Sequence, residues 1–426
     1  MQMKNKVKSE KGIMTMYVTV AVVTFTIILV ALFSLAVATR KNQIKTLIKI
    51  KEVYEQDNSK KEQIYMEQKR KLPYTSNTKP YYPDDTFERD SDTNLDTGLV
   101  IRDSDGNEYV WIEVPKSLYN NEAYNTETET ADQKPTKSTD YDKIEYCLHK
   151  YTDYYRNGTK HTDTYYSDAV TGLTSTQYEE LKQKMLKSVY ENGGFWIGRY
   201  EAGITKRTAS GTSTVAPLSK QGTVENPVYP YNDVTCSQAQ TLASQLSTGK
   251  SYTSSLMFGV QWDLVMKHIE VKEVAKGTAL ATIQSALRSN SKEWGNYYNA
   301  SFVINRGKYA KYGALSSEWN NYNTALENCV TYANGISRKV SSNSFENGIL
   351  LTTGASDECK KMNIYDLAGN VWEWTLEYTA DTDIPCAVMG GSYSNYGSST
   401  PASSRSGNRT NSKFLSFVGF RPSLFK

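Results

Sequence analysis

Thiol and imidazole side chains are the groups in this chain that could hold a soft metal ion or act as nucleophiles. The 426 residues include three histidines and five cysteines. The histidines are separated by 12 and 107 residues and the cysteines are also scattered, so neither set has the spacing of a multi-ligand zinc or iron site. The positions are His149, His161 and His268, and Cys147, Cys236, Cys329, Cys359 and Cys386.

The five cysteines are an odd set, so at least one thiol stays free if one or two disulfides form outside the membrane. Their pairing cannot be read from the sequence. We favour Cys359 with Cys386, because these two flank the aromatic segment YDLAGNVWEWT at residues 365–375. In that segment two tryptophans alternate with Glu373, so on a strand both indoles face one side and the carboxylate faces the other.

Secondary-structure signals divide the body of the chain into helical segments and short strands. Asp105-Gly106, between runs of β-forming residues, predicts a hairpin within residues 98–115. Residues 120–167 are polar and rich in tyrosine, and we expect an insertion loop with little regular structure. Further signals are helical spacing of apolar residues at 175–190, 236–247 and 259–270, and a strand-like run at 193–203.

Three separated motifs resemble those of the formylglycine-generating enzyme, or sulfatase-modifying factor, family. They are YDLAGNVWEWT, GGSY at residues 390–393 and GFRP at residues 419–422. The earlier segments FWIGRYEAG, NPVYPYNDVTCSQAQTLASQL and SSLMFGVQWDLVM fall in the order of the family's equivalent pieces. The resemblance covers roughly residues 98–426. It implies an α+β, C-type-lectin-like domain with little regular secondary structure.

The resemblance also implies a calcium site, because this aromatic turn holds a calcium ion in some family members. Carried over by motif, the ligands would be the carboxylates of Asp366 and Glu373 and the backbone carbonyls of Gly369 and Val371. Hard oxygen ligands of this kind suit Ca²⁺. The alternative is that the tryptophans belong to the core and Glu373 is a solvated neighbour.

The chain departs from the family where the family's chemistry would lie. In its oxygen-dependent enzymes two cysteine thiolates between the GGS and GFR motifs hold copper, whereas Tyr393 to Val418 contains neither cysteine nor histidine. Copper requires thiolate or imidazole ligands, and the related iron-dependent sulfoxide synthases need a histidine cluster. We therefore expect no copper, no iron and no catalytic residue; an enzyme with a divergent site is the alternative.

Residues 390–413 have the composition of a binding surface, with eight Ser, three Asn, four Gly and two Tyr. Tyrosine gives contact area at low entropic cost, while Ser, Asn and Gly give adaptable hydrogen bonds. The segment lines the binding groove in the family, and it resembles the variable region of proteins that retroelements diversify. A flexible surface loop is the alternative. We expect ligand contacts from Tyr393, Asn395, Tyr396, Arg405, Asn408 and Arg409.

The N-terminal region predicts a membrane anchor. No charged residue occurs from Ile13 to Thr39, and about 20 apolar residues span a bilayer. The alternative is a signal peptide cleaved after Ala38. We favour a retained anchor, because the apolar stretch exceeds the usual length of such peptides. The expected divisions are a basic cytoplasmic leader at 1–12, a transmembrane helix at 13–39, a stalk helix at 40–72, a linker at 73–97 and the domain at 98–426.

Composition narrows the class of protein. Lys plus Arg total 49 and Asp plus Glu total 46, and this near-balance argues against a nucleic-acid binder. The 32 tyrosines suit an extracellular binding surface. We therefore expect a cell-surface protein that binds an extracellular protein or glycan. A pilin-like leader ending at Gly12 leaves a third interpretation open, a filament subunit that self-assembles through its N-terminal helix.

Overall fold

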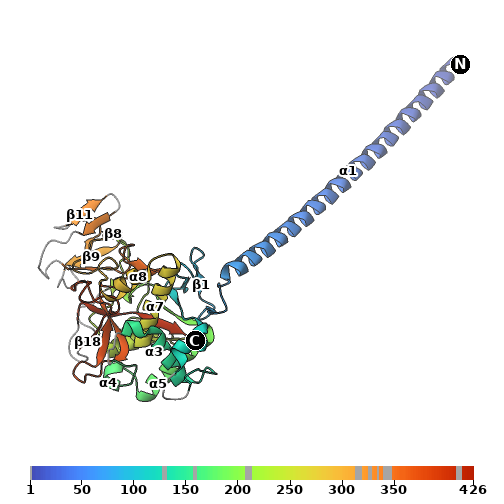
Figure 1. Ribbon diagram of the computed structural model, residues 1–426. Helices are drawn as coiled ribbons and strands as arrows, with labels where there is room; N and C mark the ends of the chain where they lie inside the picture. The colour runs from blue at the N-terminus through green and yellow to red at the C-terminus, as the bar shows by residue number, and fades with distance from the viewer. Residues whose placement is uncertain are drawn as a thin grey trace. The chain divides into compact units, whose positions relative to one another are not determined.

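The computed structural model forms two compact units, Met1–Lys71 and Leu72–Lys426, which are described separately. Its labelled elements are shown in Figure 1. The structure describes residues 2–126, 132–156, 161–206, 214–311, 319–324, 329–332, 335–338, 348–408 and 415–426.

The first unit is a single helix, α1 (Gln2–Arg70), which confirms the long helix expected from the sequence (Figure 1). Its large apolar side chains from Ile13 to Val37 are all at least half exposed. The helix ends shortly before Pro73, a residue that cannot continue the backbone hydrogen-bond ladder. Its length and composition are those of a helix that can cross a membrane, either as an anchor or as a signal sequence.

The second unit contains a six-stranded antiparallel sheet in the order β1-β2-β3-β4-β20-β7. The hairpin predicted around Gly106 is confirmed as β2 and β3, and Gly106 takes the positive φ of +82° that this turn requires. The C-terminal strand lies between β4 and β7, so the end of the chain completes this sheet. The strands are β1 (Glu88–Arg89), β2 (Val100–Arg102), β3 (Glu108–Glu113), β4 (Gly194–Gly198), β7 (Thr253–Leu256) and β20 (Pro422–Phe425).

A four-stranded sheet, in the order β18-β17-β16-β19, contains the aromatic segment and its neighbours. Its strands are β16 (Trp372–Tyr378), β17 (Cys386–Met389), β18 (Arg405–Asn408) and β19 (Val418–Phe420). The remaining strands form small sheets: β5 (Gly203–Ile204) with β6 (Tyr229–Pro230); β8 (Val303–Ile304) with β11 (Cys329–Tyr332) and β12 (Gly335–Arg338); β9 (Lys308–Lys311) with β10 (Asn320–Asn321) and β13 (Ile349–Leu351); and β14 (Lys360–Lys361) with β15 (Ile364–Tyr365).

Helices pack around these sheets, and the mixture agrees with the α+β prediction. The three helices expected from helical spacing are confirmed as α5 (Ser175–Asn192), α6 (Cys236–Gln245) and α7 (Gly259–Ala275). One cluster of buried apolar residues joins them to β16 and β17. The other helices are η1 (Lys116–Asn120), α2 (Glu122–Asn125), α3 (Tyr141–Arg156), α4 (Asp168–Thr171) and α8 (Leu280–Arg288).

Helix α3 corrects our expectation of an irregular loop over residues 120–167. Its 16 residues bury Ile144, Cys147, Leu148 and Tyr155 on one face. Tyrosine supplies part of this buried face, and counting tyrosine as polar concealed the helical pattern. The segment therefore contributes a helix to the core instead of a surface insertion.

Residues 73–97, for which we expected an extended linker, are packed onto the six-stranded sheet. Phe87 and Thr78 are fully buried, and the Thr78 hydroxyl accepts a hydrogen bond from the Trp111 indole at 2.8 Å. Strand β1 of this segment pairs with β2. The average polarity of the segment did not reveal the few side chains that anchor it.

The buried histidine of α7 gives the fold a testable pH dependence. His268 Nδ1 accepts a hydrogen bond from the Glu113 N–H at 3.2 Å, and burial, reinforced by Lys272, lowers its pKa to about 3. As the pH falls from about 7 to about 4, the unfolded chain protonates this histidine while the folded chain keeps it neutral. The free energy of unfolding should therefore fall, by about 2–3 kcal/mol from this group.

His268→Gln keeps an acceptor for the Glu113 N–H and removes the titrating group. Urea unfolding of both proteins across this pH range measures the difference. The wild-type stability should fall more steeply than that of His268→Gln, and parallel curves would show that His268 titrates normally in the folded chain.

Candidate functional site

The aromatic turn and the C-terminal region meet through a buried ion pair. Glu373 lies on β16 and Arg421 lies between β19 and β20, and the exposed fraction of both side chains is 1% or less. Arg421 donates to both carboxylate oxygens of Glu373 at 2.6–3.1 Å. It also donates to the carbonyl oxygens of Gly198 at 2.9 Å and Tyr365 at 2.8 Å. One side chain therefore joins four segments of the chain.

Two further carboxylates lie near this pair. Glu201 accepts hydrogen bonds from the Asn370 side-chain amide at 2.8 Å and from the Val371 N–H at 3.2 Å. Asp366 Oδ2 accepts from the Gly354 N–H at 2.9 Å, while its Oδ1 has no partner among the residues that the structure describes. Burial raises the pKa of Glu201 well above its usual range and that of Asp366 to about 6.

The turn itself depends on Gly369, whose φ is +77°. A Cβ atom there would come within 2.5 Å of the Asn296 carbonyl oxygen, so only glycine allows this close approach. Asn296 in turn donates its side-chain amide to Asn370 Oδ1 at 2.9 Å. The backbone geometry around the carboxylates is therefore tightly determined.

The four expected calcium ligands lie in this one turn, but they differ in whether their oxygen atoms are available to bind a cation. Asp366 has a buried oxygen without a hydrogen bond to any described residue, which fits a cation ligand. Glu373 uses both of its oxygens to accept from Arg421. Gly369 and Val371 would contribute only backbone carbonyls. Calcium at this turn therefore stays a prediction.

The expected ligand-binding residues differ in how far their side chains are buried. Tyr393 is 1% exposed and packs against Leu350 and Val371, and the side chain of Arg405 is also buried. Asn395 and Tyr396 are half-buried: Asn395 Oδ1 accepts from the Ser392 N–H at 3.1 Å, and the Tyr396 ring contacts that of Tyr298 edge to face. Of the remaining two, Asn408 ends β18 and Arg409 lies outside the described residues.

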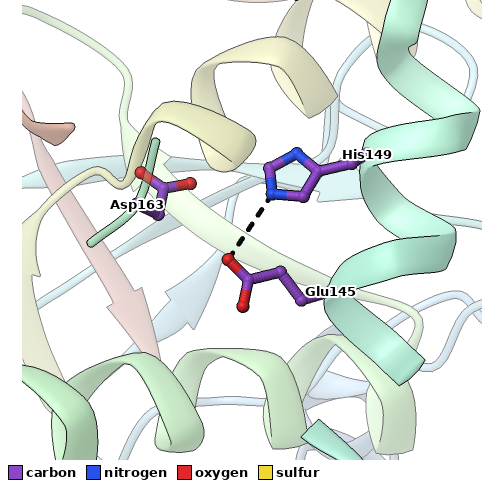
Figure 2. Close-up of side chains that lie close together, drawn as sticks. All are labelled: Glu145, His149 and Asp163. Atoms are coloured by element: carbon purple, nitrogen blue, oxygen red, sulfur yellow. Dashed lines mark ion pairs between the residues drawn. The ribbon is translucent and has the colours of Figure 1, made fainter. Parts of the chain in front are cut away.

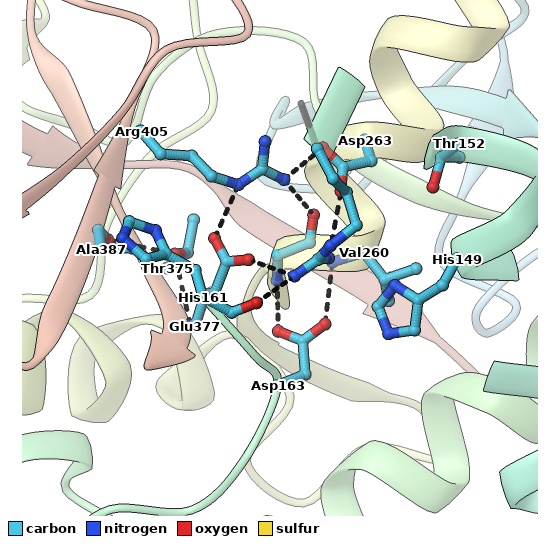
Figure 3. A network of polar contacts seen from close by, with 12 residues as sticks. His149, Thr152, His161, Asp163, Val260, Asp263, Thr375, Glu377, Ala387 and Arg405 are labelled. Atoms are coloured by element: carbon cyan, nitrogen blue, oxygen red, sulfur yellow. Dashed lines mark hydrogen bonds and ion pairs between the residues drawn. The ribbon is translucent and has the colours of Figure 1, made fainter. Parts of the chain in front are cut away.

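Arg405 belongs to a buried ring of ion pairs with Arg156, Asp263 and Glu377 (Figure 3). Arg405 Nε donates to Glu377 at 2.9 Å, and its terminal nitrogen donates to Asp263. Arg156 donates to the other oxygen of each acid, at 2.8 Å to Glu377 and at 3.2 Å to Asp263. Two positive and two negative charges therefore balance, as buried charges must. The ring connects β18, α3, α7 and β16.

Beside this ring, Asp163 caps α7 from a distant part of the chain. Its two carboxylate oxygens accept from the N–H groups of Gly259 at 2.6 Å and Val260 at 2.9 Å. A negative charge at the N-terminus of a helix is favourable. Burial, together with the nearby charge of Glu377, nevertheless raises the pKa of Asp163 to about 6.

A pocket of about 420 Å³ opens next to Asp163. It brings together two of the three histidines, which their spacing in the sequence had not suggested. Glu145 and His149 lie four residues apart on α3, and this spacing would have identified them if the segment had been predicted as a helix. The charged and imidazole side chains that line the pocket include Asp142, Glu145, His149, His161, Asp163 and Lys182.

The cysteines whose side chains the structure describes are buried free thiols, Cys147, Cys236, Cys359 and Cys386. Burial raises the pKa of Cys147 to about 11 and those of Cys359 and Cys386 well above the usual range. Protonated thiols are poor nucleophiles and poor metal ligands. The Cys386 thiol contacts that of Cys236, so the structure does not support our pairing of Cys386 with Cys359.

Comparison with protein families matches residues 150–423 to the sulfatase-modifying factor enzyme 1-like domain. The match covers well over half of the chain and includes the aromatic turn, the ring of ion pairs and the segment from Gly390 to Asn408. No curated protein matches the chain.

Replacing Arg405 by methionine tests the ring. The substitution leaves Asp263 and Glu377 with Arg156 as the one remaining cation of the ring, and we expect the free energy of unfolding to fall by about 3–5 kcal/mol. Arg306→Met is the comparison variant, because it removes a partly exposed pair with Asp357 and one hydrogen bond to the Gly354 carbonyl oxygen, for which we expect a smaller loss of about 1–2 kcal/mol. Denaturant unfolding measures both, and equal small losses would contradict a stabilising ring.

Proposed function

We propose that this chain, which belongs to the sulfatase-modifying factor enzyme 1-like family, is a membrane-anchored binding protein that displays a C-type-lectin-like domain outside the cell. In this proposal the domain has lost the family's thiol oxidation. The observation that carries it is the absence of cysteine and histidine from Tyr393 to Val418, where the family's enzymes hold copper.

The surroundings of this interval support the loss of copper chemistry. Arg405 begins β18 within it, and its guanidinium takes part in a buried ring of hard oxygen and nitrogen groups. Copper in these enzymes needs soft, ionised sulfur ligands. Cys386, the described cysteine nearest in sequence, is buried with a strongly raised pKa.

The same interval combines a rigid base with accessible side chains, as a binding surface requires. Tyr393 and Arg405 are buried and fix its path. Between them, Asn395 and Tyr396 are half-buried and Ser398 is exposed. Tyrosine, asparagine and serine are the side chains that adaptable binding surfaces use most. The ligand in this proposal is an extracellular protein or glycan.

Codon-by-codon sequencing of this gene across isolates of one population tests the proposal. If a retroelement diversifies the surface, changes should concentrate between codons 390 and 418 at adenine positions. The structure adds that they should fall on accessible positions such as Asn395, Tyr396 and Ser398 and should spare Tyr393 and Arg405. An interval without variation would contradict a diversified surface. Variation at Arg405 as frequent as that at Asn395 and Tyr396 would contradict the proposal that the buried residues form a fixed base.

The proposal includes one calcium ion at the aromatic turn, held by Asp366, Gly369, Val371 and Glu373. Glu201, Asp366 and Glu373 are buried near Arg421, and a divalent cation would favour the ionised form of the carboxylates whose pKa burial raises. The Asp366 oxygen that accepts no hydrogen bond within the described part of the chain supports the same assignment.

Metal analysis of the purified full chain tests both metal assignments together. We expect calcium and neither copper nor iron. A chelator should lower the melting temperature, added calcium should restore it, and Asp366→Ala should lose the restoration by calcium. Bound copper with oxidation of a cysteine-containing peptide would support the alternative of a divergent enzyme, and a chain insensitive to chelator would contradict the calcium site.

A further inference from the structure

Glu145, His149 and Asp163 form a compact group of metal-ligating side chains in the pocket beside α7 (Figure 2). One ligand atom from each lies within 4.8 Å of the others. Glu145 and His149 are one turn apart on α3, with His149 Nε2 3.4 Å from Glu145 Oε1. Asp163 comes from the segment before α4, so the group joins two separate parts of the chain.

The Asp163 carboxylate is held firmly in place. Both of its oxygens accept backbone N–H groups from the first turn of α7, which fixes the orientation of the group. Second-shell hydrogen bonds of this kind orient carboxylates that bind metal ions. On His149, Nδ1 makes no hydrogen bond to any part of the chain that the structure describes, so it can carry the ring proton while Nε2 binds an ion.

The charge in the pocket favours a cation. Arg156 reaches it but is already balanced within the ring by Asp263 and Glu377. The carboxylates that remain outnumber the one lysine of the pocket lining.

We propose that Glu145, His149 and Asp163 bind one divalent transition-metal ion such as zinc. One imidazole nitrogen with two carboxylates suits the borderline ions of the first transition row, whereas calcium and magnesium prefer oxygen ligands throughout. Three protein ligands leave a fourth zinc position free. That position opens into the pocket, where water or an oxygen atom of a bound molecule completes the coordination.

Lys182 acts as the internal counter-ion of this site. Its Nζ lies 3.2 Å from Glu145 Oε2 and donates to the Asp163 carbonyl oxygen at 3.1 Å. A metal ion must therefore compete with an ammonium group that already neutralises one ligand. Removing this ammonium should strengthen metal binding, which is opposite in sign to the effect of removing a ligand.

Calorimetric titration of the full chain in detergent, purified without a histidine tag, tests the site with zinc chloride. We expect one zinc ion per chain, and Glu145→Gln and His149→Gln should each weaken binding at least about tenfold. His161→Gln is the matched control, because His161 lines the same pocket outside the group, and its affinity should equal that of the wild type.

Three further measurements make the assignment specific. Lys182→Met should bind zinc more tightly than the wild type, and Asp366→Ala should bind it equally well, which separates this site from the aromatic turn. In Asp366→Ala, which lacks the calcium site of the aromatic turn, calcium chloride should bind at least about tenfold more weakly than zinc chloride. The proposal is overturned if His149→Gln binds zinc like the wild type, or if His161→Gln loses as much affinity as His149→Gln.

Discussion

The need to pair buried charges is the constraint on which the rest of this domain depends. Arg405 and Arg156 are largely inaccessible to water, and neither can lose its proton. Each must therefore lie within reach of a carboxylate, and in this structure Asp263 and Glu377 each pair with both arginines. This requirement brings one strand, two helices and the end of another strand to a single place.

The pocket follows from that arrangement. Because Arg156 ends α3, its pairing fixes the helix against α7 and directs the face that carries Glu145 and His149 toward the start of α7. Asp163 then serves two purposes, since it caps α7 and lies within reach of both side chains. The structural network and the proposed metal site thus share their supporting elements. The Asp163 carboxylate is oriented without any contribution from the ion, and such preorganisation favours selective binding.

The sequence predicted the parts of this structure that depend on neighbours along the chain. Helical spacing identified α5, α6 and α7, a turn dipeptide identified the hairpin, and motifs identified the family. It did not predict the ring, because Arg156 and Glu377 are 221 positions apart and nothing local marks them as partners. It also missed α3, whose buried face includes tyrosine, and so it missed the His149 spacing as well.

Burial of Tyr393 and Arg405 changes how the C-terminal segment must be understood. Its composition suggested a uniformly accessible surface. For the proposed binding role, residues anchored in the core reduce the entropy that mobile side chains would lose on binding. Ion pairs hold Arg405 and apolar packing holds Tyr393, whereas Asn395 and Tyr396, which lie between them in the sequence, are half-buried. A fold arranged in this way tolerates changes at the accessible positions, since the interactions that determine its path lie elsewhere.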